Sequence, residues 1–211
     1  MSDPYESRDE AGIDTLERLE RLLPTEAHLE VVLAHYGETH RRYHTLGHVD
    51  AVLRAIDRWY PDAGDAIRLA GVYHDVIYIP GADDNERRSA ELAVDALVGY
   101  LPAADVALVH HAIAATAHHD LRRVMARAVP LVVADLIGMD CPVEEYRETT
   151  ARIRAEYARF DDAQWAQGRR AFVERLLARR LLPEEPRFDG PEARIRANWA
   201  DELARLPRVG P

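Results

Sequence analysis

The sequence contains no lysine, because all 27 of its basic residues are arginine. A Schiff-base lysine and the lysine of a Walker A phosphate loop are therefore excluded. Acidic residues number 37, which gives a formal net charge of -10 and disfavours binding to long nucleic acid. A phosphate group bound by this chain would have to be neutralised by arginine, histidine, backbone amides or a metal ion.

Cysteine and long apolar runs are also scarce. Cys141 is the only cysteine, so an intramolecular disulfide and a thiolate metal cluster are excluded. No apolar run approaches the roughly 18 residues of a membrane span. These features predict a cytoplasmic protein with no membrane partner, and they leave both a monomer and a homo-oligomer open.

Strand-like alternation is nearly absent. Apolar residues recur at three- and four-residue spacing, as in IDTLERLERLL and ARIRAEYARF, which is typical of amphipathic helices. Prolines, glycines and paired aspartates divide the chain into some eight to ten helices. We predict one all-α domain over residues 1–211, with the metal-site motifs in 40–135 and packing helices in 142–205.

Two segments carry more specific predictions. A helix is expected from about Asp83 to Leu101, since it opens with acidic residues and continues with an apolar stripe. The stretch LLPEEPRFDGPE near the end is expected to be extended and non-helical.

Histidine is clustered, because all ten histidines lie between His28 and His119. In HRRYHTLGHVD, His40, His44 and His48 stand four residues apart, so a continuous helix would place them on one face. A solvated stripe of histidines is the alternative interpretation of this spacing.

Two aspartates interrupt apolar segments. His74 and Asp75 are adjacent in LAGVYHDVIY, and Asp135 lies within PLVVADLIGMD. A buried carboxylate is normally neutralised by a partner charge or a metal, and an adjacent imidazole favours the metal. Asp135 is equally compatible with a turn position near Gly138.

The segment HHAIAATAHHD is a third histidine cluster. His111 shares a helical face with His118 and His119 if the helix persists, so a further ligand or a proton donor could come from here. Alternatively, the segment is the exposed end of a helix, where cationic imidazoles suit the negative end of the dipole.

Seven features follow one another along the chain: HRRYHTLGHV, YHDVIY, DNERRSA, Thr116 with His119, ADL, IRAEY and QGRR. Together they resemble the HD superfamily, which is named for its His-Asp pair. The chain is particularly similar to the small bacterial proteins called predicted metal-dependent HD phosphohydrolases. The resemblance runs from about His40 to Arg180 and implies a helical HD-domain bundle.

The resemblance implies that His48, His74, Asp75 and Asp135 bind a metal ion. Related sequences often read Asp-x-Asp-Leu at the last position, whereas this chain has Val133 in place of the first aspartate, so Asp135 alone is expected to bind there. The family's Thr-x-x-His spacing, counted from Thr116, selects His119 over His118.

Two imidazoles and two carboxylates suit Mn, Fe, Co, Ni or Zn better than Ca, with Mg considered for a second site. Such an ion can lower the pKa of a bound water from about 15.7 to near 7. We therefore predict hydrolysis of a small phosphorylated metabolite or nucleotide by a metal-activated water, which Asp75 would help to orient.

The predicted catalytic residues are Asp75, Glu86 and His119. Glu86 is interpreted as a general acid, as a carboxylate supporting a ligating imidazole, or as a helix cap. Arg41 and His44 are predicted to bind substrate, because a guanidinium matches phosphate oxygens in two-point geometry. Four other residues match family positions and are expected to form scaffold salt bridges: Arg154, Glu156, Tyr157 and Arg169.

Two other functions fit the same residues. A two-iron centre of HD type would oxidise its substrate with dioxygen, and the extra histidines keep this alternative open. A non-catalytic nucleotide-binding module would retain the metal ligands only for folding.

Overall fold

The computed structural model describes residues 8–207, and this part of the chain is helical, with no β-strand. The prediction of an all-α fold with eight to ten helices is confirmed. The ten α-helices are α1 Arg8–Leu22, α2 Glu26–Tyr36, α3 Leu46–Trp59, α4 Asp65–Tyr73, α5 Asn85–Leu97, α6 Ala103–Thr116, α7 Val129–Ile137, α8 Val143–Glu156, α9 Asp162–Leu177 and α10 Pro186–Arg205. Two 3₁₀ helices, η1 Leu121–Arg123 and η2 Ala126–Ala128, lie between α6 and α7.

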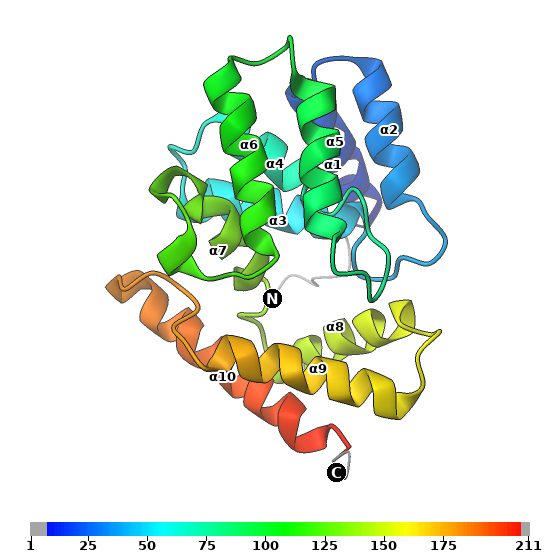
Figure 1. The fold of residues 1–211 in the computed structure, drawn as a ribbon, viewed down its shortest axis with the longest axis vertical. Helices are drawn as coiled ribbons and strands as arrows, with labels where there is room; N and C mark the ends of the chain where they lie inside the picture. Colours follow the sequence, from blue (N-terminus) through cyan, green and yellow to red (C-terminus); the bar gives the residue numbers. More distant parts are fainter. Residues whose placement is uncertain (1–7, 208–211) are drawn as a thin grey trace.

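The helices form two layers, each with its own core. Helices α1 to α7 make the upper bundle in Figure 1, and α8, α9 and α10 lie beneath it. Residues such as Leu53, Tyr73 and Val109 build the upper core. The lower core includes Phe188, Ile195 and Trp199. A boundary between two packed layers is a common position for a ligand cavity.

Helix α7 contributes to both cores. Leu131 and Ala134 belong to the upper cluster, whereas Val133 and Leu136 belong to the lower one. A helix that is apolar on nearly all sides is buried on nearly all sides. Asp135, the one charged residue of α7, therefore lies at the boundary between the layers.

His40, His44 and His48 do not lie on one continuous helix, so the condition for a shared face is not met. Helix α3 begins only at Leu46, after an extended N-cap residue Thr45. The backbone amides of residues 42–44 instead donate to the Glu156 carboxylate of α8, which holds this stretch as an irregular loop.

The helix expected over Asp83 to Leu101 is shorter at both ends. Helix α5 spans Asn85–Leu97, and Val98 is already extended. Gly99 then takes a φ of 87°, a conformation that glycine adopts without steric cost. The predicted helix was too long because the apolar pattern continues to Leu101, beyond the glycine that follows the end of α5.

The stretch expected to be extended near the C-terminus becomes helical from Pro186 onward. Proline suits the first turn of a helix because its missing N–H would lack a partner there. Helix α10 also contains Pro191, and the side chain of Phe188 is fully buried in the lower core. Tertiary burial therefore outweighed the helix-breaking residues.

None of the helices within residues 8–207 has both the length and the apolar character needed to cross a bilayer.

Candidate metal centre and adjoining cavity

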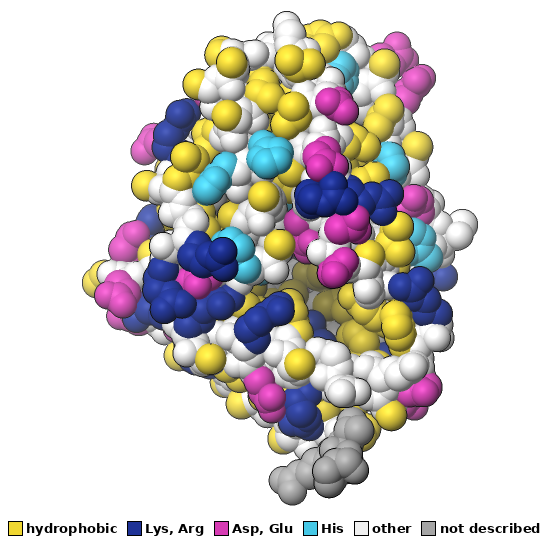
Figure 2. Space-filling model, viewed as in Figure 1, with side chains coloured by type: hydrophobic (Ala, Val, Ile, Leu, Met, Phe, Trp, Pro, Cys, Tyr) yellow, Lys and Arg dark blue, Asp and Glu magenta, His cyan; other side chains and the backbone are white. Residues whose placement is uncertain are grey.

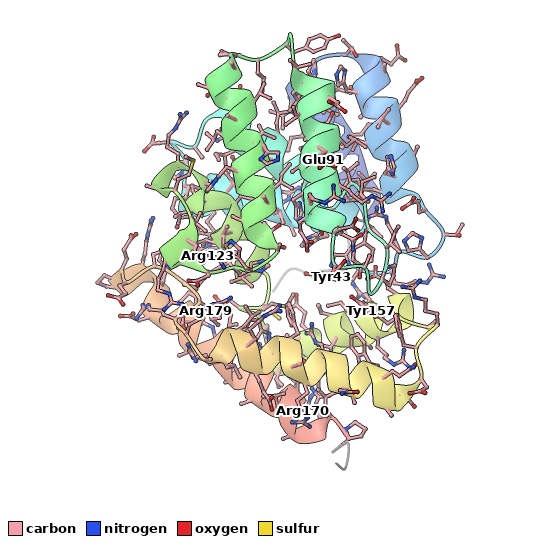
Figure 3. The ribbon with its side chains drawn as sticks, in the orientation of Figure 1. Tyr43, Glu91, Arg123, Tyr157, Arg170 and Arg179 are labelled. Atoms are coloured by element: carbon pink, nitrogen blue, oxygen red, sulfur yellow. The ribbon has the colours of Figure 1, made fainter. Side chains whose placement is uncertain are left out.

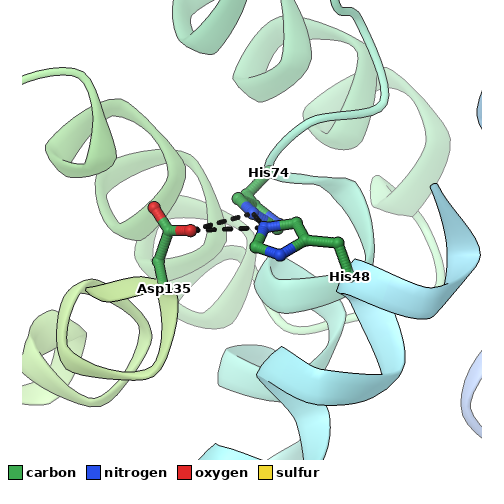
Figure 4. A group of neighbouring side chains, drawn as sticks. All are labelled: His48, His74 and Asp135. Carbon is green, nitrogen blue, oxygen red and sulfur yellow. Dashed lines mark hydrogen bonds and ion pairs between the residues drawn. The ribbon is translucent and has the colours of Figure 1, made fainter. Parts of the chain in front are cut away.

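Three helices bring the candidate ligands together. His48 lies in the first turns of α3, His74 directly follows α4, and Asp135 lies on α7 (Figure 4). Helices α3 and α4 approach closely at Gly71, where a Cβ would lie 3.2 Å from a side-chain carbon of Ile56. This close approach, three residues before His74, brings the two imidazoles side by side.

The donor atoms of three of the four predicted ligands converge on one buried point. His48 Nε2 lies 3.1 Å from His74 Nε2 and 3.3 Å from Asp135 Oδ1, and His74 Nε2 lies 3.6 Å from Asp135 Oδ1. Asp75 Oδ2 approaches the same two nitrogens at 3.1 Å and 3.5 Å. A cation about 2.0–2.2 Å from each donor leaves neighbouring donors roughly 2.8–3.6 Å apart. The buried group of His48, His74 and Asp135 could therefore hold a metal ion, with Asp75 beside it.

The His74 ring is oriented for a ligand role. Its Nδ1 donates to the Gly71 carbonyl at 2.8 Å, so Nε2 of the neutral ring presents its lone pair to the cluster. A metal-binding histidine commonly donates its other ring N–H to a carbonyl or carboxylate in this way.

The cluster carries more negative than positive charge. Burial opposes ionisation of Asp75 and Asp135, but the imidazoles beside them hold the pKa of both carboxyls below the usual value. Burial also opposes the charged form of His74, yet Asp75 and Asp135 raise its pKa well above the usual value, whereas burial lowers the pKa of His48. Without a cation, His74 faces the two carboxylates as an imidazolium. A divalent ion that took the place of its Nε2 proton would balance both carboxylates.

His119 contacts the other oxygen of Asp135, with its Nε2 2.7 Å from Oδ2. Its backbone φ is 50°, a left-handed conformation that is uncommon for residues other than glycine and that clusters at functional sites. Asp135 thus lies between the two imidazoles on one side and His119 on the other.

His44 is held against the cluster by a carboxylate. Its Nδ1 lies 2.7 Å from Glu156 Oε2, and its Nε2 lies 4.0 Å from Asp75 Oδ2. The same Glu156 oxygen accepts from the Tyr78 hydroxyl, and the other oxygen accepts three backbone amides. Burial would raise the pKa of Glu156, but these hydrogen bonds, that from His44 first, lower it to about 2.

A cavity of about 840 Å³ opens beside the cluster, between the two layers. Its walls include Asp75, Asp135, His44, His119 and Glu86. Burial raises the pKa of Glu86, and the charges of Asp75 and Asp135 act in the same direction. A carboxyl that keeps its proton more firmly than usual beside a cavity is suited to acid catalysis.

Arg41 does not take the position predicted for it. Its buried guanidinium donates to Glu38, to the carbonyls of His44 and Asp75, and to the carbonyl of Val76. Arg41 is also absent from the cavity walls. The prediction that Arg41 binds substrate is corrected: with its donors engaged, the side chain fastens the loop before α3 to the turn after α4.

His111 and His118 of the third cluster bind backbone amides and are not part of the candidate ligand group. His111 Nε2 accepts from the Met125 amide, and His118 Nδ1 accepts from the Asp120 amide. Among the residues expected to form scaffold salt bridges, Arg169 pairs with Glu202 at 2.8 Å and Arg154 pairs with Asp162 at 2.7 Å.

Sequence reasoning missed the role of Glu156. It lies on the buried face of α8, which also carries Tyr146, Thr150 and Ile153 at helical spacing. A carboxylate on a buried helical face needs polar partners, and that signal was present in the sequence. What the sequence did not indicate is that the partners would be a loop more than a hundred residues away.

Neither a protein-family profile, nor a curated protein, nor a solved structure matches this chain.

Proposed function

We propose that this chain is a metal-dependent phosphohydrolase of the HD type that cleaves a small phosphate ester. The observation that carries the proposal is the convergence of His48, His74 and Asp135, with Asp75 Oδ2 3.1 Å and 3.5 Å from the two imidazole nitrogens, beside a cavity of substrate size. A divalent transition ion bound there would supply Lewis acidity toward phosphoryl oxygens and an activated water.

Hydrolysis requires that a water oxygen bond to phosphorus while the bond from phosphorus to the ester oxygen breaks and the alcohol leaves with a proton. His44 is well placed to hold that proton, because Glu156 binds its Nδ1 and so directs Nε2 toward Asp75 and the cavity. A carboxylate bound to one ring nitrogen of an imidazole in this way fixes which nitrogen faces the site. Glu86 is the second candidate for the proton, since its pKa is raised.

The test is metal analysis of the purified protein followed by assays on a panel of phosphate esters. His74→Ala and Asp135→Asn should lose the stoichiometric metal and lower kcat/KM by more than about 100-fold, the upper range for disturbing a partner of a ligand. His110→Ala is the matched control, because His110 is exposed and lies outside the site. Full activity of the metal-free protein, or of the His74→Ala variant, would refute the proposal.

A two-metal centre is the second candidate, favoured by the position of Asp135. Its Oδ1 faces His48 and His74 while its Oδ2 contacts His119, so the carboxylate could bridge two ions. Two irons per chain together with dioxygen consumption would favour the oxygenase alternative, whereas phosphate release without oxygen uptake favours hydrolysis.

A further inference from the structure

One face of α9 forms a wall of the cavity. Trp165, Arg169, Phe172 and Arg175 all line the cavity and follow one another at spacings of four, three and three residues. Such spacing places side chains in a row along one helical face. These four side chains therefore form one continuous row on the cavity side of α9.

Flat groups alternate along this wall. The Arg169 guanidinium carbon lies 5.9 Å from the centre of the Trp165 ring and 5.2 Å from that of Phe172. Arg175 lies 5.5 Å from the same Phe172 ring, and Tyr157 extends the row with its ring 5.0 Å from Trp165. Aromatic rings and guanidinium groups both stack against flat partners.

The rings keep part of their surface open. Tyr157, Trp165 and Phe172 are only partly buried, although aromatic side chains of this size gain much from complete burial. Tyr43 and Tyr78 line the same cavity from the upper layer, and Figure 3 places Tyr43 and Tyr157 at the junction of the layers. In Figure 2 hydrophobic surface is visible in the hollow between the layers, with basic and acidic side chains at its edge.

The two arginines of the wall differ in charge balance. Arg169 is paired with Glu202, so its charge is neutralised within the lower layer. Arg175 is exposed and forms no ion pair with the side chains described, those of residues 14–207. In a chain with a net charge of -10, an unpaired guanidinium on a cavity wall attracts anions locally.

We infer that the α9 wall binds a flat aromatic or heteroaromatic ring in the alcohol part of the substrate, so that the substrates are phosphate esters carrying such a ring. The inference rests on the proposed function for the phosphate part of the molecule. The cavity volume of about 840 Å³ lies within the usual range of roughly 300–1,000 Å³ for small-molecule sites. A polyol would require a row of hydrogen-bonding groups. Among the α9 residues that line the cavity, amide and guanidinium groups are carried by Gln164, Arg169 and Arg175, and Arg169 is already paired with Glu202.

The test compares benzyl phosphate with cyclohexylmethyl phosphate, two primary esters that differ in whether the ring is flat. We expect kcat/KM for the benzyl ester to be about tenfold higher or more, the scale of one ring stacked on an aromatic side chain. Trp165→Leu, which keeps apolar volume but removes the ring, should bring the ratio near unity. Trp165→Phe should largely retain the preference.

Tyr100→Leu is the matched control, because Tyr100 is 55% exposed and lies outside the cavity. Phe172→Leu repeats the test should Trp165→Leu fail to fold. A ratio near unity in the unaltered protein, or a ratio unchanged in the folded leucine variants, would overturn the inference while leaving the proposed phosphohydrolase function intact.

A binding measurement separates the two proposals if neither ester is hydrolysed. Benzylphosphonate and cyclohexylmethylphosphonate, whose phosphorus–carbon bond resists hydrolysis, are titrated calorimetrically into the full chain. About tenfold tighter binding of the benzyl compound, lost in Trp165→Leu, supports the ring site although hydrolysis has failed. Equal binding of the two compounds overturns the ring site.

Discussion

Two buried polar clusters on either side of the cavity differ in how their charges are balanced. In the lower layer, Glu202 accepts from Arg169 and from the Tyr146 hydroxyl, so one anion meets one cation and a neutral donor. In the upper layer, Asp75 and Asp135 face the imidazoles of His48 and His74 across 3.1–3.6 Å. The lower cluster is complete with protein groups alone, whereas the upper one retains negative charge.

This difference separates a structural ion pair from a group that could hold a metal ion. Both clusters combine ionisable groups with low exposure, so burial alone does not distinguish them. What distinguishes them is that the Nε2 atoms of two histidines lie 3.1 Å apart and face two carboxylates, an arrangement that a cation among these groups would stabilise. Four changes test the comparison.

The largest stability effect is expected from Glu202→Ala, which leaves the Arg169 charge buried without its partner. Breaking a buried pair in this way typically costs about 3–5 kcal/mol, measured here as the free energy of unfolding in urea. Metal binding in the upper layer should be unchanged. A loss below about 1 kcal/mol would show that the pair is not needed to neutralise Arg169.

Glu156 connects the two layers, and its contribution should depend on pH. Because its pKa falls from the ordinary 4.5 to about 2 in the folded chain, it stabilises the fold above pH 4.5 and loses that effect as pH falls toward 2. The shift corresponds to roughly 3 kcal/mol. Glu156→Gln should therefore be markedly less stable than the unaltered protein at pH 6 but nearly equal to it at pH 2, as measured by urea unfolding.

The matched control is Glu148→Gln on the same helix, where the side chain is 61% exposed and only loosely paired. The Glu148→Gln substitution should change the free energy of unfolding only slightly at every pH. A stability difference for Glu156→Gln that stayed constant with pH would contradict the assigned cause.

Metal addition should stabilise the chain through the upper cluster alone. At a free Mn²⁺ or Zn²⁺ concentration of about 100 times Kd, the gain is about 2.7 kcal/mol, or roughly 5–10 °C in Tm for a chain of this size. Asp135→Asn should abolish this increase in a thermal melt, while Glu202→Ala should keep it from a lower starting Tm. An increase that survives in Asp135→Asn would assign the metal to other residues.

The smallest effect is expected from Arg175→Ala. Since this exposed arginine forms no ion pair with the described side chains of residues 14–207, its removal should change the free energy of unfolding by less than about 0.5 kcal/mol. This change in the free energy of unfolding is measured by chemical denaturation. A loss as large as that of Glu202→Ala would mean that Arg175 has a structural role like that of Arg169.

Local sequence patterns predicted part of this architecture. The apolar period predicted the helices, and Asp135 within an apolar segment predicted a buried carboxylate. Predictions that depended on which neighbours a residue meets were less accurate. Arg41 precedes the ligand helix in sequence, yet it packs against the turn after α4, because the backbone carbonyls there are buried and need donors.

By itself, the sequence determined an all-helical chain without lysine whose histidines are confined to one segment and whose aspartates interrupt apolar runs, because composition and helical period are local properties. Only the tertiary structure decided that α3, α4 and α7 meet at one point, that Glu156 of α8 orients His44, and that α9 lines the cavity. Those contacts join residues far apart in the chain, and they are set by how two apolar cores pack against α7 and not by any neighbouring residue.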